Sequence, residues 1–297
     1  MDNPEILDPL FREAVSAIDA GEVSALERLL ATHPRLVRER LDSPGAWLRE
    51  KVGGALEGYF RRPYLLWFVA ENPIRNDRLP ANIAQVTRAI IEAAERERVD
   101  SLREQLTYTL ELVCTGRVAR ECGVQRELID LLIDAGAGPG QGHGALGSRN
   151  FAAVEKLVER GAELTFAAAI CLDRTDDMTR LARAASAEDR QVALAAAALN
   201  GKAEALALLI DLGVDLNAYS TGIHPHATAL HHAVDSGSLD AVKVLVEAGA
   251  ELGTRDRVYE GTPLDWAEHL GRAEIGAYLR EKGGQQQNGG FYEDQSE

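Results

Sequence analysis

The chain has 297 residues, of which 45% are hydrophobic, and carries 32 Lys and Arg against 47 Asp and Glu, a formal net charge of -15. This apolar content suffices for one elongated domain or two compact ones. The excess of negative charge repels polyanions, so we expect no nucleic acid and no membrane as partner. The three cysteines show no CxxC spacing, and we recognise neither a leader nor an apolar span of membrane length. These features favour a soluble cytoplasmic protein.

One phrase recurs along the chain: an apolar helix ends in a small residue, followed by glycine, an acidic residue and leucine. It occurs as "LLIDAGAG", "KLVERGAEL", "LLIDLGVDL" and "VLVEAGAEL", at 131–138, 156–164, 208–216 and 244–252. The glycines fall where a left-handed C-cap favours a residue without Cβ. We therefore predict helix ends at Gly136, Gly161, Gly213 and Gly249. The long interval between the second and third copies divides into two short units if "AICLDRTDDMTRLARAA" is a further helix pair.

A first helix precedes the phrase in each unit. In "HATALHHAVDSGSLDAVKVLVEAGAEL", Thr228 is the predicted N-cap of a short helix that turns at Gly237 into a second, amphipathic helix. "GTPLDWAEHLGRAEIGAYLREKG" repeats this register with Thr262 as cap and Pro263 at the first helical position. Each pair alone buries only one face, so we expect neighbouring pairs to stack.

These two stretches resemble the ankyrin repeat family, whose signature is T-P-L-H-x-A, a glycine turn and L-L-x-x-G-A-D; divergent, partly short repeats of bacterial type fit best. The resemblance implies an all-α, ankyrin-like solenoid of about seven stacked helix-turn-helix repeats with short β-finger loops. It also implies four segments: an N-terminal capping repeat at 1–40, divergent repeats with insertions at 41–124, ankyrin-like repeats at 125–283, and a disordered polar tail at 284–297.

The divergent segment is the least regular part of the chain. "RPYLLWFVAENP" is interpreted as a divergent first helix, "IAQVTRAIIEAAER" as the second helix, and "QLTYTLELVCTGRVARECG" as another degenerate unit. We expect Trp47, Trp67 and Phe68 to lie in the core. The glycine-rich "GAGPGQGHGALG" at 136–147 lacks the Gly-Lys-Ser/Thr ending of a phosphate-binding loop, so it is interpreted as a connection between repeats.

Four of the seven histidines lie in "HPHATALHHA", at 224–233. The resemblance assigns His231 a structural role near the finger backbone, and places His232 on the concave surface as a binding residue. His224 and His226 lie in a finger about three residues longer than usual. Side chains two residues apart in an extended segment point to the same side, so both rings share one side if this segment is extended. Alternatively, His224, His226 and His232 bind zinc or iron, with a carboxylate from Asp235 or Asp265.

Tyr219 and Tyr259 lie in adjacent predicted fingers, where rings with a polar tip suit recognition. Asp265 takes the place of the family histidine, and Trp266 follows it; both are candidate binding residues. The chain lacks the common nucleophile, phosphate and zinc-protease motifs, so a module that binds a protein or peptide in its concave groove is favoured over an enzyme. Its partner is expected to be basic. The alternative is an enzyme, small-molecule or metal-binding protein with a His/Asp site at residues 224–232 and 265.

Overall fold

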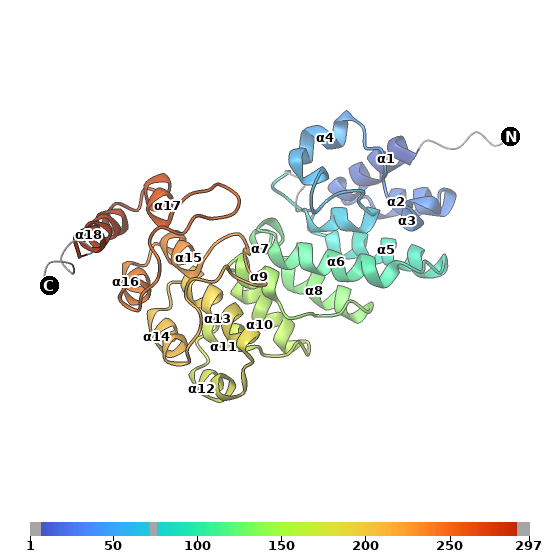
Figure 1. Ribbon diagram of the computed structural model, residues 1–297. Coiled ribbons are helices and arrows are strands. Elements are labelled where there is room, and N and C mark those ends of the chain that lie inside the picture. The colour runs from blue at the N-terminus through green and yellow to red at the C-terminus, as the bar shows by residue number, and fades with distance from the viewer. Residues whose placement is uncertain (1–6, 72–75, 290–297) are drawn as a thin grey trace, which may run out of the picture. The chain divides into compact units, whose positions relative to one another are not determined.

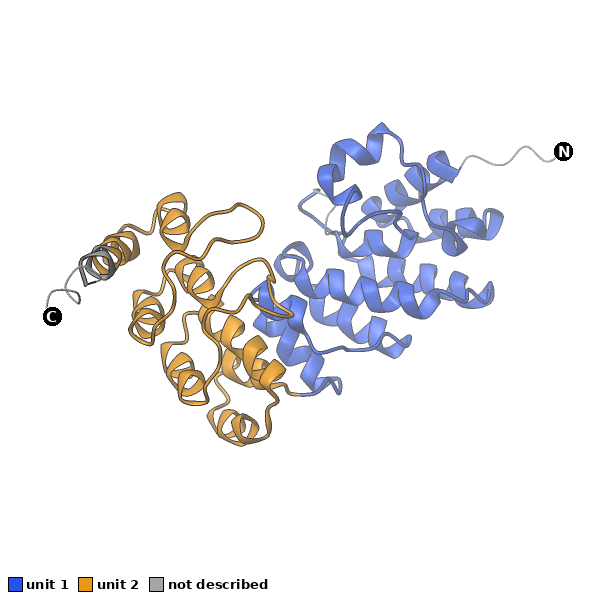
Figure 2. Cartoon of the chain, in the orientation of Figure 1, with its two compact units in different colours: residues 1–163 blue, residues 164–297 orange. Residues whose placement is uncertain are grey.

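The computed structural model describes residues 7–71 and 76–289, and its regular structure is helical (Figure 1). Within the described residues there is no strand, and the fingers contain an isolated antiparallel bridge between Tyr219 and Thr228. The predicted all-α helical repeat class is confirmed. The chain divides into two compact units, residues 1–163 and 164–297 (Figure 2), and the division falls inside the segment 125–283.

Unit 1 contains paired and irregular helices. α2 packs against α5, and α6 packs against η2, α8 and α9. The helices are α1 Leu7–Ala20, α2 Val23–Thr32, α3 Arg35–Arg38, α4 Ala46–Val52, η1 Gly53–Leu56, η2 Leu65–Ala70, α5 Ile83–Arg96, α6 Leu102–Thr115, α7 Val118–Glu121, α8 Gln125–Asp134, α9 His143–Gly147 and α10 Phe151–Glu159. α5 spans the helix predicted from "IAQVTRAIIEAAER". In "RPYLLWFVAENP", the regular structure of the described residues 62–71 is the 3-10 helix η2 in place of the predicted first helix.

An aromatic core holds the irregular part of unit 1 together. Phe68 is buried, with ring centroids 5.3 Å from Phe60 and 6.5 Å from Trp47. Trp67 is buried as predicted, while Trp47 is half-buried and donates its indole Nε1–H to the Asp8 carboxylate at 2.9 Å. Because rings of this size bury large apolar areas, they stabilise a segment that forms few helical turns.

Unit 2 is a stack of four helix pairs. α11, α13, α15 and α17 pack on one another in sequence to form an inner row, and α14, α16 and α18 follow one another in an outer row (Figure 1). The pairs are α11 Phe166–Cys171 with α12 Thr175–Ala184, α13 Ala187–Leu199 with α14 Ala203–Asp211, α15 Ala229–Ser236 with α16 Leu239–Glu247, and α17 Pro263–His269 with α18 Ala273–Gly289. Residues 192–199 of α13 are all buried, and its alanines allow the neighbouring inner helices to approach closely.

The predicted helix ends and caps are present. Gly136, Gly161, Gly213 and Gly249 follow α8, α10, α14 and α16 with φ of 108°, 96°, 72° and 96°, the left-handed region that favours glycine. α18 extends to Gly289, so residues 284–289 of the predicted tail are helical, and residues 290–297 lie outside the described residues. Every helix in the described ranges is too short or too polar to cross a membrane.

Candidate functional site

Two loops of unit 2 lie side by side, before α15 and α17 (Figure 1). We name residues 217–228 finger loop 1 and residues 254–262 finger loop 2. The backbone N–H of Arg257 donates to the carbonyl of His226 at 2.8 Å, and the Tyr219 hydroxyl donates to the carbonyl of Arg255 at 2.7 Å. The Arg257 guanidinium also lies 3.8 Å from the centroid of the Tyr219 ring. The two loops therefore support each other.

Asp256 organises finger loop 2 from within. It is only 2% exposed, and its carboxylate accepts hydrogen bonds from the backbone N–H groups of Val258, Tyr259 and Gly261 and from the indole N–H of Trp266, at 2.7–3.0 Å. Burial alone would raise the pKa of Asp256, but these four donors hold it well below its ordinary range. No repeat motif or periodic pattern in the sequence singles out Asp256, although an aspartate that opens a tight loop is a known turn signal.

His231 has the structural role predicted for it. Its Nδ1 accepts from the Thr228 hydroxyl at 2.8 Å and from the Thr228 backbone N–H at 3.3 Å, and its Nε2 hydrogen-bonds the carbonyl of Gly261 at 3.1 Å. Since a carbonyl only accepts, the proton resides on Nε2, an assignment inferred from the hydrogen-bond network. Burial is the main cause that lowers the pKa of His231, so the neutral ring joins the two finger loops.

The predicted surface position of His232 is wrong. The side chain is 1% exposed, and its Nε2 hydrogen-bonds the Ser220 hydroxyl at 3.0 Å. The extra residues of finger loop 1 fold back over α15, which buries Ser220 and Ile223 beside it. A helical step of about 100° per residue correctly places His232 on a different face of α15 from His231. That local geometry does not show that finger loop 1 covers the face of His232.

The HPH segment is also not extended. His224 has a φ of 40°, and its carbonyl accepts from the backbone N–H of Ala227 at 3.3 Å, so the chain turns there. His224 is exposed and His226 is half-buried, with ring centroids 6.1 Å apart. Burial and the neighbouring His224 lower the pKa of His226, while Asp256 opposes them.

The alternative metal site lacks geometric support. His224 and His232 have ring centroids 6.0 Å apart, and His232 already bonds Ser220. Within the described ranges, no three or more His, Cys, Asp or Glu side chains are grouped so that they could hold a metal ion. In the described structure, His224, His226 and His232 therefore do not form such a group.

Asp265 and Trp266 begin α17 in the register that His231 and His232 occupy in α15. The Asp265 carboxylate accepts from the backbone N–H and the hydroxyl of Thr262, at 2.8 and 2.7 Å, which completes a capping box. The half-buried Trp266 ring lies 6.0 Å from the His226 ring and 5.2 Å from the His231 ring, centroid to centroid. Asp265 thus replaces the family histidine at the cap.

A hollow of about 500 Å³ opens beside finger loop 2. Tyr259 on its wall is 76% exposed, Leu270 on its wall is 39% exposed, and the adjoining Val258 is 59% exposed. Large apolar side chains left exposed next to a cavity are typical of binding surfaces. The hollow is lined by Asp235, Tyr259, Gly261, Asp265, Trp266, His269 and Leu270.

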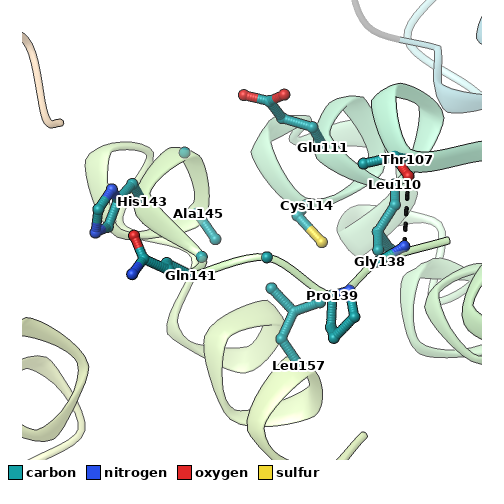
Figure 3. Close-up of a pocket in the computed structure, with 13 residues that line it drawn as sticks. Thr107, Leu110, Glu111, Cys114, Gly138, Pro139, Gln141, His143, Ala145 and Leu157 are labelled. Atoms are coloured by element: carbon teal, nitrogen blue, oxygen red, sulfur yellow. Dashed lines mark hydrogen bonds between the residues drawn. The ribbon is translucent and has the colours of Figure 1, made fainter. Parts of the chain in front are cut away.

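Unit 1 contains a smaller cavity of about 260 Å³, covered by the glycine-rich loop 136–147 (Figure 3). The Thr107 hydroxyl accepts from the backbone N–H of Gly138 at 3.4 Å and anchors the loop. Cys114 points its Sγ toward the loop, whereas the carboxylate of Glu111 and the ring of His143 point away from Cys114 (Figure 3). Burial, with a smaller contribution from Glu111, raises the pKa of the Cys114 thiol to about 12. This thiol is not a nucleophile at neutral pH.

Comparisons with known proteins bear on these two units. A family model described as ankyrin repeats (3 copies) matches the chain over residues 118–256 and again over 196–289, which together make up more than half of it. The chain is also similar to ankyrin repeat and SOCS box protein 6 of Mus musculus, with 40% identity over 67 residues. That similarity covers 23% of this chain and 16% of the mouse protein.

Proposed function

Because the chain belongs to the ankyrin repeat family, whose repeats are generally protein–protein interaction modules, we propose that unit 2 binds a protein or peptide. The contact surface consists of finger loops 1 and 2 and the concave groove along the inner helices, with Tyr259 and Trp266 at its centre. Tyr219, His224, His226 and Asp265 surround them. His232 supports this surface from below, because it is buried.

The exposure of Tyr259 on an ordered loop is the observation that carries this proposal. Its ring is 76% exposed, while its backbone N–H is held at 2.7 Å by the buried Asp256. A loop whose backbone is already fixed loses little conformational entropy on binding, and exposed tyrosine and tryptophan rings are the residue types that most often dominate the affinity of interfaces. The surface is therefore ready to bind without rearrangement of finger loop 2.

Two further properties belong to the same proposal. A net charge of -15 favours a basic partner, whose association electrostatic attraction would accelerate. All three cysteines, Cys114, Cys122 and Cys171, are free thiols in the described structure, which is consistent with a reducing compartment such as the cytoplasm.

The test is affinity capture with matched tyrosine variants. Wild-type protein, Tyr259→Ser and Tyr59→Ser are immobilised, and proteins captured from the source cell are quantified by mass spectrometry. Tyr59 is a suitable control because it is also an exposed tyrosine, at 53%, and lies in unit 1. We expect a partner retained by wild type and Tyr59→Ser but lost by Tyr259→Ser, and then confirmed by titration of the purified pair. Equal capture of every protein by all three would contradict the proposal.

A further inference from the structure

The cavity of unit 1 has an apolar floor of buried side chains. Leu110 and Cys114 of α6, Ala145 of α9 and Leu157 of α10 form this floor, and each is at most 3% exposed. The three helices pack on one another, since α9 contacts both α6 and α10. The floor is therefore part of the packed interior of unit 1.

The polar groups around this floor are directed elsewhere or already hydrogen-bonded. The backbone carbonyl of Cys114 accepts from the side-chain amide of Asn150 at 2.8 Å. The carboxylate of Glu111 and the ring of His143 point away from Cys114 (Figure 3). Among the described residues that line the cavity there is neither lysine nor arginine. The floor thus offers no charge to a ligand, and it lacks the set of about two to four polar partners that a bound water requires.

The glycine-rich loop 136–147 covers the cavity, and the packing beside it is tight. A Cβ on Gly144 would lie 2.9 Å from the Cγ2 of Thr115, so glycine at this position lets α9 approach α6 closely. By contrast, a Cβ on Gly138, whose backbone N–H is held by the hydroxyl of Thr107, would have no neighbouring atom within 4 Å. The cavity is therefore a defined space between closely packed helices, and not a result of loose packing.

The size of the cavity and its thiol indicate the class of ligand. The volume is about 260 Å³, whereas a dry apolar cavity of about 150 Å³ is already large enough for benzene. The Sγ of Cys114 points toward the glycine-rich loop (Figure 3), and sulfur makes favourable contacts with the edges of aromatic rings. A charged ligand would lose its hydration at this floor without gaining a countercharge. An uncharged aromatic ring fits these properties best.

We propose that the cavity binds a small, uncharged aromatic molecule with a single ring. The ring lies against Leu110 and Leu157, with the sulfur of Cys114 at its edge and the glycine-rich loop above it. Burial of the ring supplies the affinity, and the lack of a countercharge at the floor supplies the selectivity against charged rings. This site is independent of peptide binding by unit 2, because every residue that lines it belongs to unit 1.

The probes are para-fluorotoluene, para-fluorobenzoate and para-fluorobenzylamine, three rings of similar size that are neutral, anionic and cationic at pH 7. Their binding to the full-length protein is followed by fluorine NMR. We expect para-fluorotoluene to bind saturably and each charged ring to bind at least about tenfold more weakly. Equal binding of a charged ring, or no saturable binding of para-fluorotoluene up to its solubility limit, would overturn the inference.

Substitutions that fill the cavity test where para-fluorotoluene binds. Cys114→Met lengthens the side chain that points toward the loop and should weaken binding at least about tenfold. Cys122→Met is the matched control, because it makes the same change at an exposed residue of unit 1, and should alter affinity by less than about twofold. Gly138→Leu fills the cavity from the loop, where the backbone is outside the left-handed region, and should have the same effect as Cys114→Met. Wild-type affinity in both folded cavity variants would contradict the site.

Backbone amide signals of glycines report the position of the ring directly. In nitrogen-labelled protein, para-fluorotoluene should shift the signals of Gly138 and Gly142 and leave those of Gly213 and Gly249 in unit 2 unchanged. Tyr259→Ser removes the aromatic ring beside the hollow of unit 2 and should bind para-fluorotoluene as wild type does. Loss of binding in Tyr259→Ser, or shifts confined to unit 2, would place the ring at finger loop 2 and refute this inference, while the proposed function of unit 2 would stand.

Discussion

Replacement of Asp256 by asparagine should loosen finger loop 2 and expose how the binding surface is held. One carboxylate oxygen, Oδ1, accepts from the backbone N–H groups of Val258 and Tyr259, and the other, Oδ2, accepts from Gly261 and from the indole of Trp266. An asparagine in the same position keeps one acceptor but turns an NH2 group toward two donors. Those two donors then have no partner in a buried site.

The magnitude follows from the number of donors left unsatisfied. Each costs about 1–3 kcal/mol when buried, so the loss of two should lower the free energy of unfolding of this part of unit 2 by about 2–6 kcal/mol. The lost charge adds to this effect, because hydrogen bonds to an ionised acceptor are the stronger ones. Because repeats contact only their neighbours, the loss should be concentrated in the α15–α18 region rather than spread over the chain.

Hydrogen exchange detected by mass spectrometry measures this local loss, with urea unfolding as the global measure. Amides of residues 258–261 should exchange at least about tenfold faster in Asp256→Asn, which corresponds to about 1.4 kcal/mol, while those of α5 keep the wild-type rate. Glu260→Gln is the matched control, because it removes one charge from an exposed side chain of the same loop. Wild-type exchange at 258–261, or an equal effect of Glu260→Gln, would refute the reasoning.

Three further outcomes are expected. Because burial lowers the pKa of His231, its contribution to stability is present above the ordinary pKa of 6.5 and should be lost as pH falls below that value. The melting temperature should therefore drop less on acidification in His231→Gln than in wild type. An equal dependence of the melting temperature on pH in the two proteins would contradict this. Burial raises the pKa of Glu71 from 4.5 to about 7, so its contribution to stability is present at low pH and is lost as pH rises through 7. In Glu71→Gln the side-chain carbonyl can still accept from the two backbone N–H groups, so the free energy of unfolding should rise by up to about 3 kcal/mol at pH 8 and change little at pH 4.5. A variant that is destabilised at pH 8 would contradict the buried charge. A thiol reagent at pH 7.5 should modify the exposed Cys122 in the native protein. It should modify Cys114 and Cys171 only after denaturation, because both are buried and burial raises their pKa values to about 12. Rapid modification of either buried thiol in the native protein would be inconsistent with the fold.

The sequence by itself determined the repeat architecture of unit 2 and the ends of four helices, two in each unit. The glycines at 136, 161, 213 and 249 adopt the predicted left-handed conformation, and Thr228 and Thr262 cap α15 and α17 as expected. These features depend on residues within about four positions of one another along the chain, where helix periodicity and capping chemistry act. The resemblance to the ankyrin repeat family, rather than local chemistry, assigned His231 its structural role and identified the finger loops as candidate binding segments.

Only the tertiary structure decided which of these candidate residues face solvent. His232 is buried because Ser220, 12 residues earlier, folds over it, and His231 joins the two fingers through a carbonyl 30 residues later. Asp256 carried no periodic signal, and its importance arises from four donors that converge only after finger loop 2 closes against α17. Local patterns specify the direction of a side chain from its own backbone, but burial and hydrogen-bond partners depend on which distant segment packs against it.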